Sequence, residues 1–242
     1  MDRINLSENT MQKKIVGIIG GLGPLATSDL FRKIILNTKA KSDQDHIRVI
    51  IDNNTQIPDR TSALLRGGES PLPEIIKSAR LLCDMGADIL IMPCHTSHYF
   101  HAEIQKRLDI PLLNMVALTR DSLLKGGIKK AALLATEGTV KMKTYERVFE
   151  NSGIELLIPT DEEQKAVTDL IYKGVKAGDK SFNTTEFKSV AQKLFERGAE
   201  ILILGCTELP LAMEMYNLDY NVCDPTTELA RGAIIAANAE VI

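Results

Sequence analysis

One stretch of this chain occurs twice, 112 residues apart (residue 198 against residue 86). Residues 86–94 read GADILIMPC, and residues 198–206 read GAEILILGC. Each copy has a glycine that suits the end of a helix, an acid, four apolar residues that suit a buried strand, and a cysteine at its end. Because this period is too long for a solenoid, it indicates tandem duplication of a domain-sized unit.

Apolar runs of strand length alternate with longer segments of helical periodicity along both halves of the chain. Besides the second copy of the repeat, the expected strands cover residues 15–19, 48–51, 88–92, 111–113, 130–135 and 155–158. Strands that are buried on both faces and joined by helices predict parallel sheets with right-handed crossovers. The expected fold class is therefore α/β, with two similar lobes, each a parallel four-stranded sheet flanked by helices.

The repeat also predicts how the chain is divided. Residues 13–118 are expected to form the first lobe, and residues 119–225 the second. Residues 1–12 are expected to be a flexible leader before the first strand. Residues 226–242 are expected to form a helix that packs back on the first lobe.

Charge and hydropathy exclude several classes of partner. The formal net charge is -3 and the isoelectric point is about 5.9, so nothing favours binding to nucleic acid or to an acidic membrane surface. No apolar run reaches the roughly 20 residues that span a bilayer, and the first residues lack the apolar core of a secretory signal. We therefore expect a cytoplasmic protein whose 4 cysteines stay reduced.

Cys94 lies in the first expected lobe and Cys206 in the second, each at the end of a strand. Because ligands collect at the carboxyl ends of parallel strands, both cysteines can face one cleft between the lobes. Four interpretations are open: small buried apolar residues, a disulfide, a metal site shared with His95 and His98, or chemistry by reactive thiols. The spacing is not that of paired zinc ligands, and we expect no bound metal.

The chemical interpretation depends on the setting of the two thiols. A thiol just before a helix feels the positive end of the helix dipole, which lowers its pKa. Thr96 and Thr207 are expected to cap those helices. Two thiols on opposite sides of a bound α-carbon could remove a proton from one face and supply one to the other. Such an arrangement would invert a stereocentre.

Four motifs follow one another in order along the chain. They read GGLGPLAT at residues 20–27, NNTQIPDRT at 53–61, MPCHTSH at 92–98 and LGCTE at 204–208. Together they resemble the motifs of the aspartate/glutamate racemase family, and most closely those of its aspartate racemase branch. The resemblance implies a two-lobed fold, an amino-acid racemase that needs no pyridoxal phosphate or other cofactor, and a homodimer.

The resemblance also implies roles for individual residues. It makes Cys94 and Cys206 the two catalytic bases, assigns a substrate carboxylate to Arg60, and assigns an acidic substrate side chain to Lys176. A guanidinium fork suits a carboxylate because it can donate two parallel hydrogen bonds. The remaining substrate-binding residues implied are Asn54, His95, Thr96, Thr139 and Thr207. The implied substrate is an acidic amino acid, aspartate before glutamate.

His95 departs from the family pattern, which commonly has asparagine directly after the first cysteine. A neutral imidazole could replace the asparagine amide as a hydrogen-bond donor. A cationic imidazole would bind a carboxylate more strongly and depress the pKa of the neighbouring thiol. A third alternative is that the larger ring crowds the pocket and changes the substrate.

The glycine motif and the two cysteines also fit other functions. Residues 21–26, GLGPLA, fit a dinucleotide-binding fingerprint, but Asp52 comes later than the ribose-binding acid of such a site. A tight turn lining the active site is the favoured interpretation. A maleate-type cis-trans isomerase would use one cysteine as nucleophile, and a dicarboxylate-binding protein would use neither. Exchange of the α-hydrogen of an acidic amino acid in D₂O separates these alternatives from a racemase.

Overall fold

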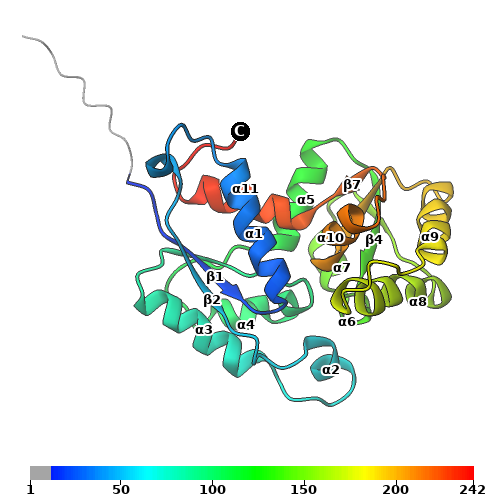
Figure 1. Ribbon diagram of the computed structural model, residues 1–242, viewed down its shortest axis with the longest axis horizontal. Helices are drawn as coiled ribbons and strands as arrows, with labels where there is room; N and C mark the ends of the chain where they lie inside the picture. The colour runs from blue at the N-terminus through cyan, green and yellow to red at the C-terminus, as the bar shows by residue number, and fades with distance from the viewer. Residues whose placement is uncertain (1–11) are drawn as a thin grey trace, which may run out of the picture.

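The computed structural model describes residues 12–242 and shows two α/β lobes lying side by side (Figure 1). Each lobe is a parallel sheet with helices on both faces, and the two sheets have three and four strands. The predicted fold class is confirmed. Residues 1–11 of the expected leader lie outside the described part of the chain. Across residues 12–242, no helix combines the length and apolar character needed to cross a membrane.

The first lobe is built on a sheet whose central strand is β1. Its elements are β1 (Val16–Gly20), α1 (Pro24–Asn37), η1 (Asp43–Asp45), β2 (Val49–Asn53), α2 (Arg60–Leu65), α3 (Leu72–Asp84), β3 (Ile89–Ile91), η2 (Thr96–Phe100) and α4 (His101–Gln105). The strand order is β2-β1-β3, with every pair parallel. Helix α1 packs on one face of this sheet, while α3 and α4 pack on the other.

The first sheet has three strands where four were expected. The segment at 111–113 reaches β3 but forms a single bridge, between Leu90 and Leu112. The chain leaves the sheet there because the side chain of Asn114 accepts a hydrogen bond from the first turn of the next helix, α5 (Met115–Lys125). A helix cap therefore ends the fourth strand before it can extend.

The second lobe repeats this plan with a complete fourth strand. Its elements are β4 (Lys130–Ala135), α6 (Glu137–Lys141), α7 (Thr144–Phe149), β5 (Glu155–Leu157), α8 (Asp161–Asp169), the π-helix η3 (Leu170–Lys176), α9 (Thr185–Glu196), β6 (Ile201–Gly205), α10 (Glu208–Met215) and β7 (Val222–Cys223). The strand order is β5-β4-β6-β7. Helices α8, η3, α9 and α10 pack on one face, and α5 and α7 pack on the other.

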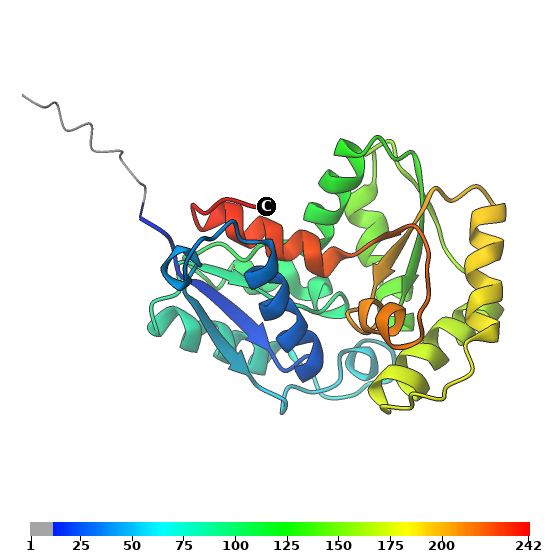
Figure 2. The same ribbon diagram turned by 45° about the horizontal axis from the view of Figure 1, so that its top comes forward.

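The last helix, α11 (Pro225–Ala236), follows the second sheet but packs on the first lobe. Its Leu229 and Ala233 are buried in the core of the first lobe, and Figure 2 shows the helix lying beside α1. The expected boundary between residues 118 and 119 falls inside α5, which contributes Met115 to the core of the first lobe and Leu123 to the second. A division at that position stays a prediction.

The turn after β1 depends on glycine. Gly21 has φ +84°, and a Cβ on it would collide with the backbone of Asn54, so a larger residue cannot be placed there. The Thr27 hydroxyl accepts a hydrogen bond from Gly21 N at 3.0 Å and donates one to Gly23 O at 2.9 Å. Pro24 then begins α1. The turn therefore holds the carboxyl ends of β1 and β2 close together.

Candidate functional site

A cavity lies between the lobes, at the carboxyl ends of both sheets. Its lining comes from the turns after β1, β3, β4 and β6 and from the regions of α2 and η3. The lining residues are Leu22, Asp59, Arg60, Thr61, Cys94, His95, Thr96, Thr136, Tyr172, Lys176, Cys206, Thr207 and Glu208. Cys94 and Cys206 are both buried free cysteines. The two copies of the repeated segment thus bring their cysteines to one cavity.

His98 holds the turn that carries Cys94. Its Nδ1 lies 2.8 Å from Cys94 O, and its Nε2 accepts a hydrogen bond from Met115 N at 3.0 Å. Both ring nitrogens are therefore occupied by the backbone, which leaves none for a metal. Among residues 12–242, no group of three or more His, Cys, Asp or Glu side chains is placed to hold a metal ion.

The burial of His98 predicts a loss of stability in acid. Burial lowers the pKa of His98 from 6.5 to about 4, whereas the unfolded chain titrates near its ordinary value. The contribution of His98 to the stability of the fold is therefore full above pH 6.5 and is lost as the pH falls towards about 4. This contribution is on the order of 3 kcal/mol. Urea unfolding across this pH window measures the slope. His98→Gln, which cannot titrate, should make this slope shallower, while buried His95 still contributes to it, and an unchanged slope would contradict this origin.

Cys206 takes part in a hydrogen-bonded cluster around Glu208. The Cys206 thiol donates to Glu208 Oε2 at 2.9 Å, and the Thr207 hydroxyl donates to the same oxygen at 3.2 Å. Lys176 Nζ lies 2.8 Å from the other carboxylate oxygen, Oε1. Glu208 is only 7% exposed, so these charged contacts act in a low dielectric. The cluster fixes the direction of the Cys206 S–H bond.

The expected lowering of the thiol pKa at a helix start is wrong for Cys206. Burial raises the pKa of Cys206 well above its ordinary value, and the negative charge of Glu208 raises it further. Helix α10 has only 8 residues, and its dipole is opposed by this carboxylate in its first turn. Cys206 is therefore held as a thiol.

The two threonines expected to cap helices do not do so. Thr96 lies at the start of η2 and Thr207 directly precedes α10, but neither element has a side-chain cap. The Thr207 hydroxyl bonds to Glu208 instead. The Thr96 hydroxyl lies 2.9 Å from that of Thr136 and 3.1 Å from that of Thr139, which are 3.0 Å apart. These three hydroxyls form a buried triangle that joins the lobes.

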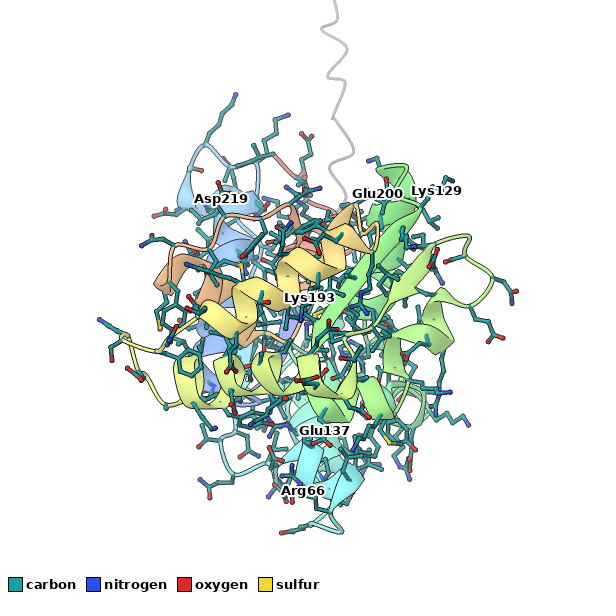
Figure 3. All side chains as sticks on the ribbon, turned by 90° about the vertical axis from the view of Figure 1, so that its right-hand side faces the viewer. Arg66, Lys129, Glu137, Lys193, Glu200 and Asp219 are labelled. Carbon is teal, nitrogen blue, oxygen red and sulfur yellow. The ribbon has the colours of Figure 1, made fainter. Side chains whose placement is uncertain are left out.

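Further contacts between the lobes close the cavity. Arg66, at the end of α2, pairs with Glu137 of α6 at 3.4 Å, and Figure 3 shows both at the lower edge of the molecule. A Cβ on Gly138 would lie 2.9 Å from the Thr61 hydroxyl, so α6 and α2 are in close contact. The cavity has a volume of about 20 Å³, close to that needed by one water molecule. The cavity must therefore widen to hold an amino acid.

Arg60 is the first residue of α2 and is fixed by the backbone. Its Nη2 donates to Leu22 O at 2.6 Å and its Nη1 donates to Pro58 O at 3.2 Å. Its Nε is buried and has no hydrogen-bond partner within the described residues. Burial acts to lower the pKa of Arg60, but the combined effect of Cys94, Asp59 and Glu208 nearby outweighs it, so the pKa of Arg60 is raised. A fixed cation whose Nε–H has no hydrogen-bond partner within the described residues therefore stands beside Cys94.

His95 is buried next to Cys94, with 2% of its surface exposed. Its Nδ1 lies 2.8 Å from the Tyr145 hydroxyl, and the two rings stack with centroids 5.8 Å apart. Burial, together with the nearby His98, lowers the pKa of His95 well below its ordinary value. Of the alternatives weighed for this residue, burial supports the neutral imidazole.

A model of the Asp/Glu/hydantoin racemase family matches residues 19–233, which is most of the chain. The chain belongs to this racemase family. It is 28% identical over 224 residues to the broad specificity amino-acid racemase RacX of Bacillus subtilis, covering 91% of this chain and 96% of that protein. Two solved structures are similar over nearly the whole chain. An aspartate racemase of Picrophilus torridus has a TM-score of 0.83 and 33% identity, covering 95% of this chain and 96% of its own. A putative Asp/Glu racemase of Yersinia pestis has a TM-score of 0.78 and 27% identity, with coverage of 93% and 99%.

In this racemase family member, two of the residues expected to bind substrate do not line the cavity. Asn54 packs against the glycine turn, and its Oδ1 accepts a hydrogen bond from Gln56 N at 3.0 Å. Thr139 lies behind Thr96 in the hydroxyl triangle. The other residues expected in the site lie in the cavity lining.

The cavity also contains residues that sequence reasoning missed. Glu208 had a signal, because it directly follows the Cys-Thr pair of the LGCTE motif. Thr136 and Tyr172 had none, since they come from the turn after β4 and from η3, which only the folded chain brings together at the cavity. Tyr145 likewise had no signal, although it contacts His95 directly.

Proposed function

We propose that this chain interconverts the L and D enantiomers of an acidic amino acid, aspartate before glutamate, without a cofactor. One of the two cysteines, Cys94 and Cys206, removes a proton from the α-carbon, and the other donates a proton to it. One observation carries the proposal: two buried thiols, one from each lobe, line the same cavity as Arg60 and Lys176. Membership of the racemase family supports the class of reaction.

The reaction needs one base and one acid on opposite faces of the substrate. A thiolate removes the α-hydrogen as a proton, and the electron pair of the C–H bond passes into the carboxylate to give an enediolate. The opposite thiol then donates its proton to the α-carbon, which inverts the configuration. Because Cys206 is held as a thiol by Glu208, we assign the first deprotonation to Cys94.

The enediolate carries negative charge that the site must stabilise. Arg60 stands beside Cys94 as a fixed cation whose Nε–H lacks an acceptor within the described residues, and it would bind the α-carboxylate where this charge develops. Glu208 would in turn receive the substrate ammonium group. These groups are positioned before the substrate binds, so little rearrangement is needed during the reaction.

Two cations in one small cavity favour a substrate with two carboxylates. Arg60 would bind one carboxylate, and Lys176, which already pairs with Glu208 at 2.8 Å, would bind the other. Of the two acidic amino acids, we place aspartate first. The similar structure at 33% identity, an aspartate racemase, supports the same order.

A panel of L- and D-amino acids, without pyridoxal phosphate, tests the proposal. Exchange of the α-hydrogen in D₂O is followed by proton NMR, and inversion by chiral chromatography. We expect exchange and inversion of both aspartate enantiomers, slower turnover of glutamate, and none of alanine or lysine. No exchange with any acidic amino acid would overturn the racemase, and equal turnover of alanine would overturn the acidic specificity.

A further inference from the structure

His95 and Tyr145 form a buried pair at the edge of the cavity, one from each lobe. We propose that Tyr145 is a positioning residue that fixes His95 as its Nε2–H tautomer, and that this N–H donates a hydrogen bond to a carboxylate oxygen of the substrate. The second part rests on the proposed racemase function, whereas the first concerns the free protein.

The tautomer follows from the hydrogen that the Tyr145 phenol must donate. Tyr145 is fully buried, and a buried O–H almost always has an acceptor. The Tyr145 oxygen lies 2.8 Å from His95 Nδ1. Among the described residues, this is the contact of the Tyr145 oxygen that has hydrogen-bond geometry. The Thr119 hydroxyl is also nearby and donates its own hydrogen to Met115 O at 2.8 Å. The Thr119 oxygen could still accept, but the contact with hydrogen-bond geometry is the one to His95 Nδ1. If Tyr145 donates to Nδ1, a neutral imidazole carries its proton on Nε2.

The position of Nε2 indicates what it binds. Nε2 is buried and has no hydrogen-bond partner within the described residues, and His95 lines the cavity with Cys94 and Arg60. Leaving a buried N–H without an acceptor is costly, so the site is built for a ligand that supplies one. An N–H donor needs a hydrogen-bond acceptor, and the strongest acceptors on the substrate are its carboxylate oxygens.

His98 provides an internal reference for this assignment. Its Nε2 accepts a hydrogen bond from Met115 N, so its proton must lie on Nδ1, which then donates to Cys94 O. Two histidines three residues apart are therefore expected in opposite tautomers. The chain has only 4 histidines, so their ring nitrogens can be resolved individually.

Long-range proton–nitrogen NMR of protein labelled with ¹⁵N-histidine tests the tautomers, and His95→Asn assigns the His95 signals. We expect protonated Nε2 in His95 and protonated Nδ1 in His98. Tyr145→Phe should turn His95 into a mixture of tautomers and leave His98 unchanged. Thr119→Val, the matched control, should change neither. Protonated Nδ1 in wild-type His95, or a Tyr145→Phe spectrum identical to wild type, would overturn the positioning role of Tyr145.

Aspartate binding tests the second part. Adding aspartate should shift the His95 Nε2–H resonance in wild type, and Tyr145→Phe should raise KM by about 3–10-fold, the value of one hydrogen bond, with a smaller change in kcat. An unmoved resonance with aspartate bound would overturn the contact with substrate. If racemisation itself is absent, the spectra of the free protein still decide the tautomer. If Tyr145→Phe does not fold, the wild-type and Thr119→Val spectra decide it.

Discussion

Replacing either Cys94 or Cys206 with alanine is expected to reduce racemisation by about 10³-fold or more, because inversion needs a base on one face and an acid on the other. Each single variant keeps one thiol, so it should still exchange the α-hydrogen of one enantiomer with D₂O, without inverting it. Cys94→Ala and Cys206→Ala should do so for opposite enantiomers. Proton NMR measures the exchange, and chiral chromatography measures the inversion.

The other two cysteines are matched controls for this experiment. Cys83 in α3 and Cys223 in β7 are free cysteines outside the cavity lining, so Cys83→Ala and Cys223→Ala should retain full racemisation. Full activity without Cys206 would refute the two-base mechanism. Exchange of the same enantiomer by both active-site variants would refute the placement of the thiols on opposite faces.

Replacing Glu208 with glutamine should lower kcat/KM by about 10²-fold, in the range expected for a group that controls proton transfer. The variant leaves only one acceptor oxygen for the Cys206 S–H and Lys176, and it removes the ionic partner of Lys176. It also removes a negative charge that raises the pKa of Cys206, so this pKa should fall. Alkylation of Cys206 by iodoacetamide, followed by peptide mass spectrometry, should then begin at lower pH than in wild type.

Glu214→Gln is the control for this change. Glu214 lies on the same helix, but its side chain is 70% exposed and pairs with Arg32 at 3.2 Å, on the other lobe. Neither racemisation nor the alkylation of Cys206 should change in this variant. If the pH dependence of Cys206 alkylation is the same in Glu208→Gln as in wild type, the Glu208 carboxylate does not raise the pKa of Cys206.

The sheets could be predicted from the sequence because strands buried on both faces leave uninterrupted apolar runs. The repeat of residues 86–94 at 198–206 predicted that the lobes match, and the sheets do share one plan. The exception is the segment at 111–113, whose apolar residues suit a strand. Its length was limited by the cap at Asn114, which belongs to the following helix.

The topology of the sheets predicted only the site residues that directly follow a strand, whereas Arg60 and Lys176 were assigned by the family resemblance. Cys94 and Cys206 each end a copy of the repeat, so their positions follow from the topology of the sheets. The pKa of Cys206 did not follow, because burial and the Glu208 carboxylate outweigh a short helix dipole. Tyr145 reaches His95 from 50 residues away in sequence, and no periodicity or spacing encodes such a contact.

The two cysteines are equivalent in the repeat but not in their surroundings, since Cys206 faces the Glu208 carboxylate and Cys94 stands beside the Arg60 guanidinium. A racemisation reaches equilibrium at equal amounts of both enantiomers, so the two values of kcat/KM must be identical whatever the site looks like. The different surroundings of the two cysteines can therefore change kcat and KM individually for each enantiomer, but not make the two ratios unequal. Under the proposed two-base mechanism, each inversion would leave the proton on the other sulfur, and the free protein would have to reset before it accepts the same enantiomer again. At substrate concentrations high enough for binding to outpace this reset, the reset rather than the chemistry at the α-carbon would set the rate of turnover.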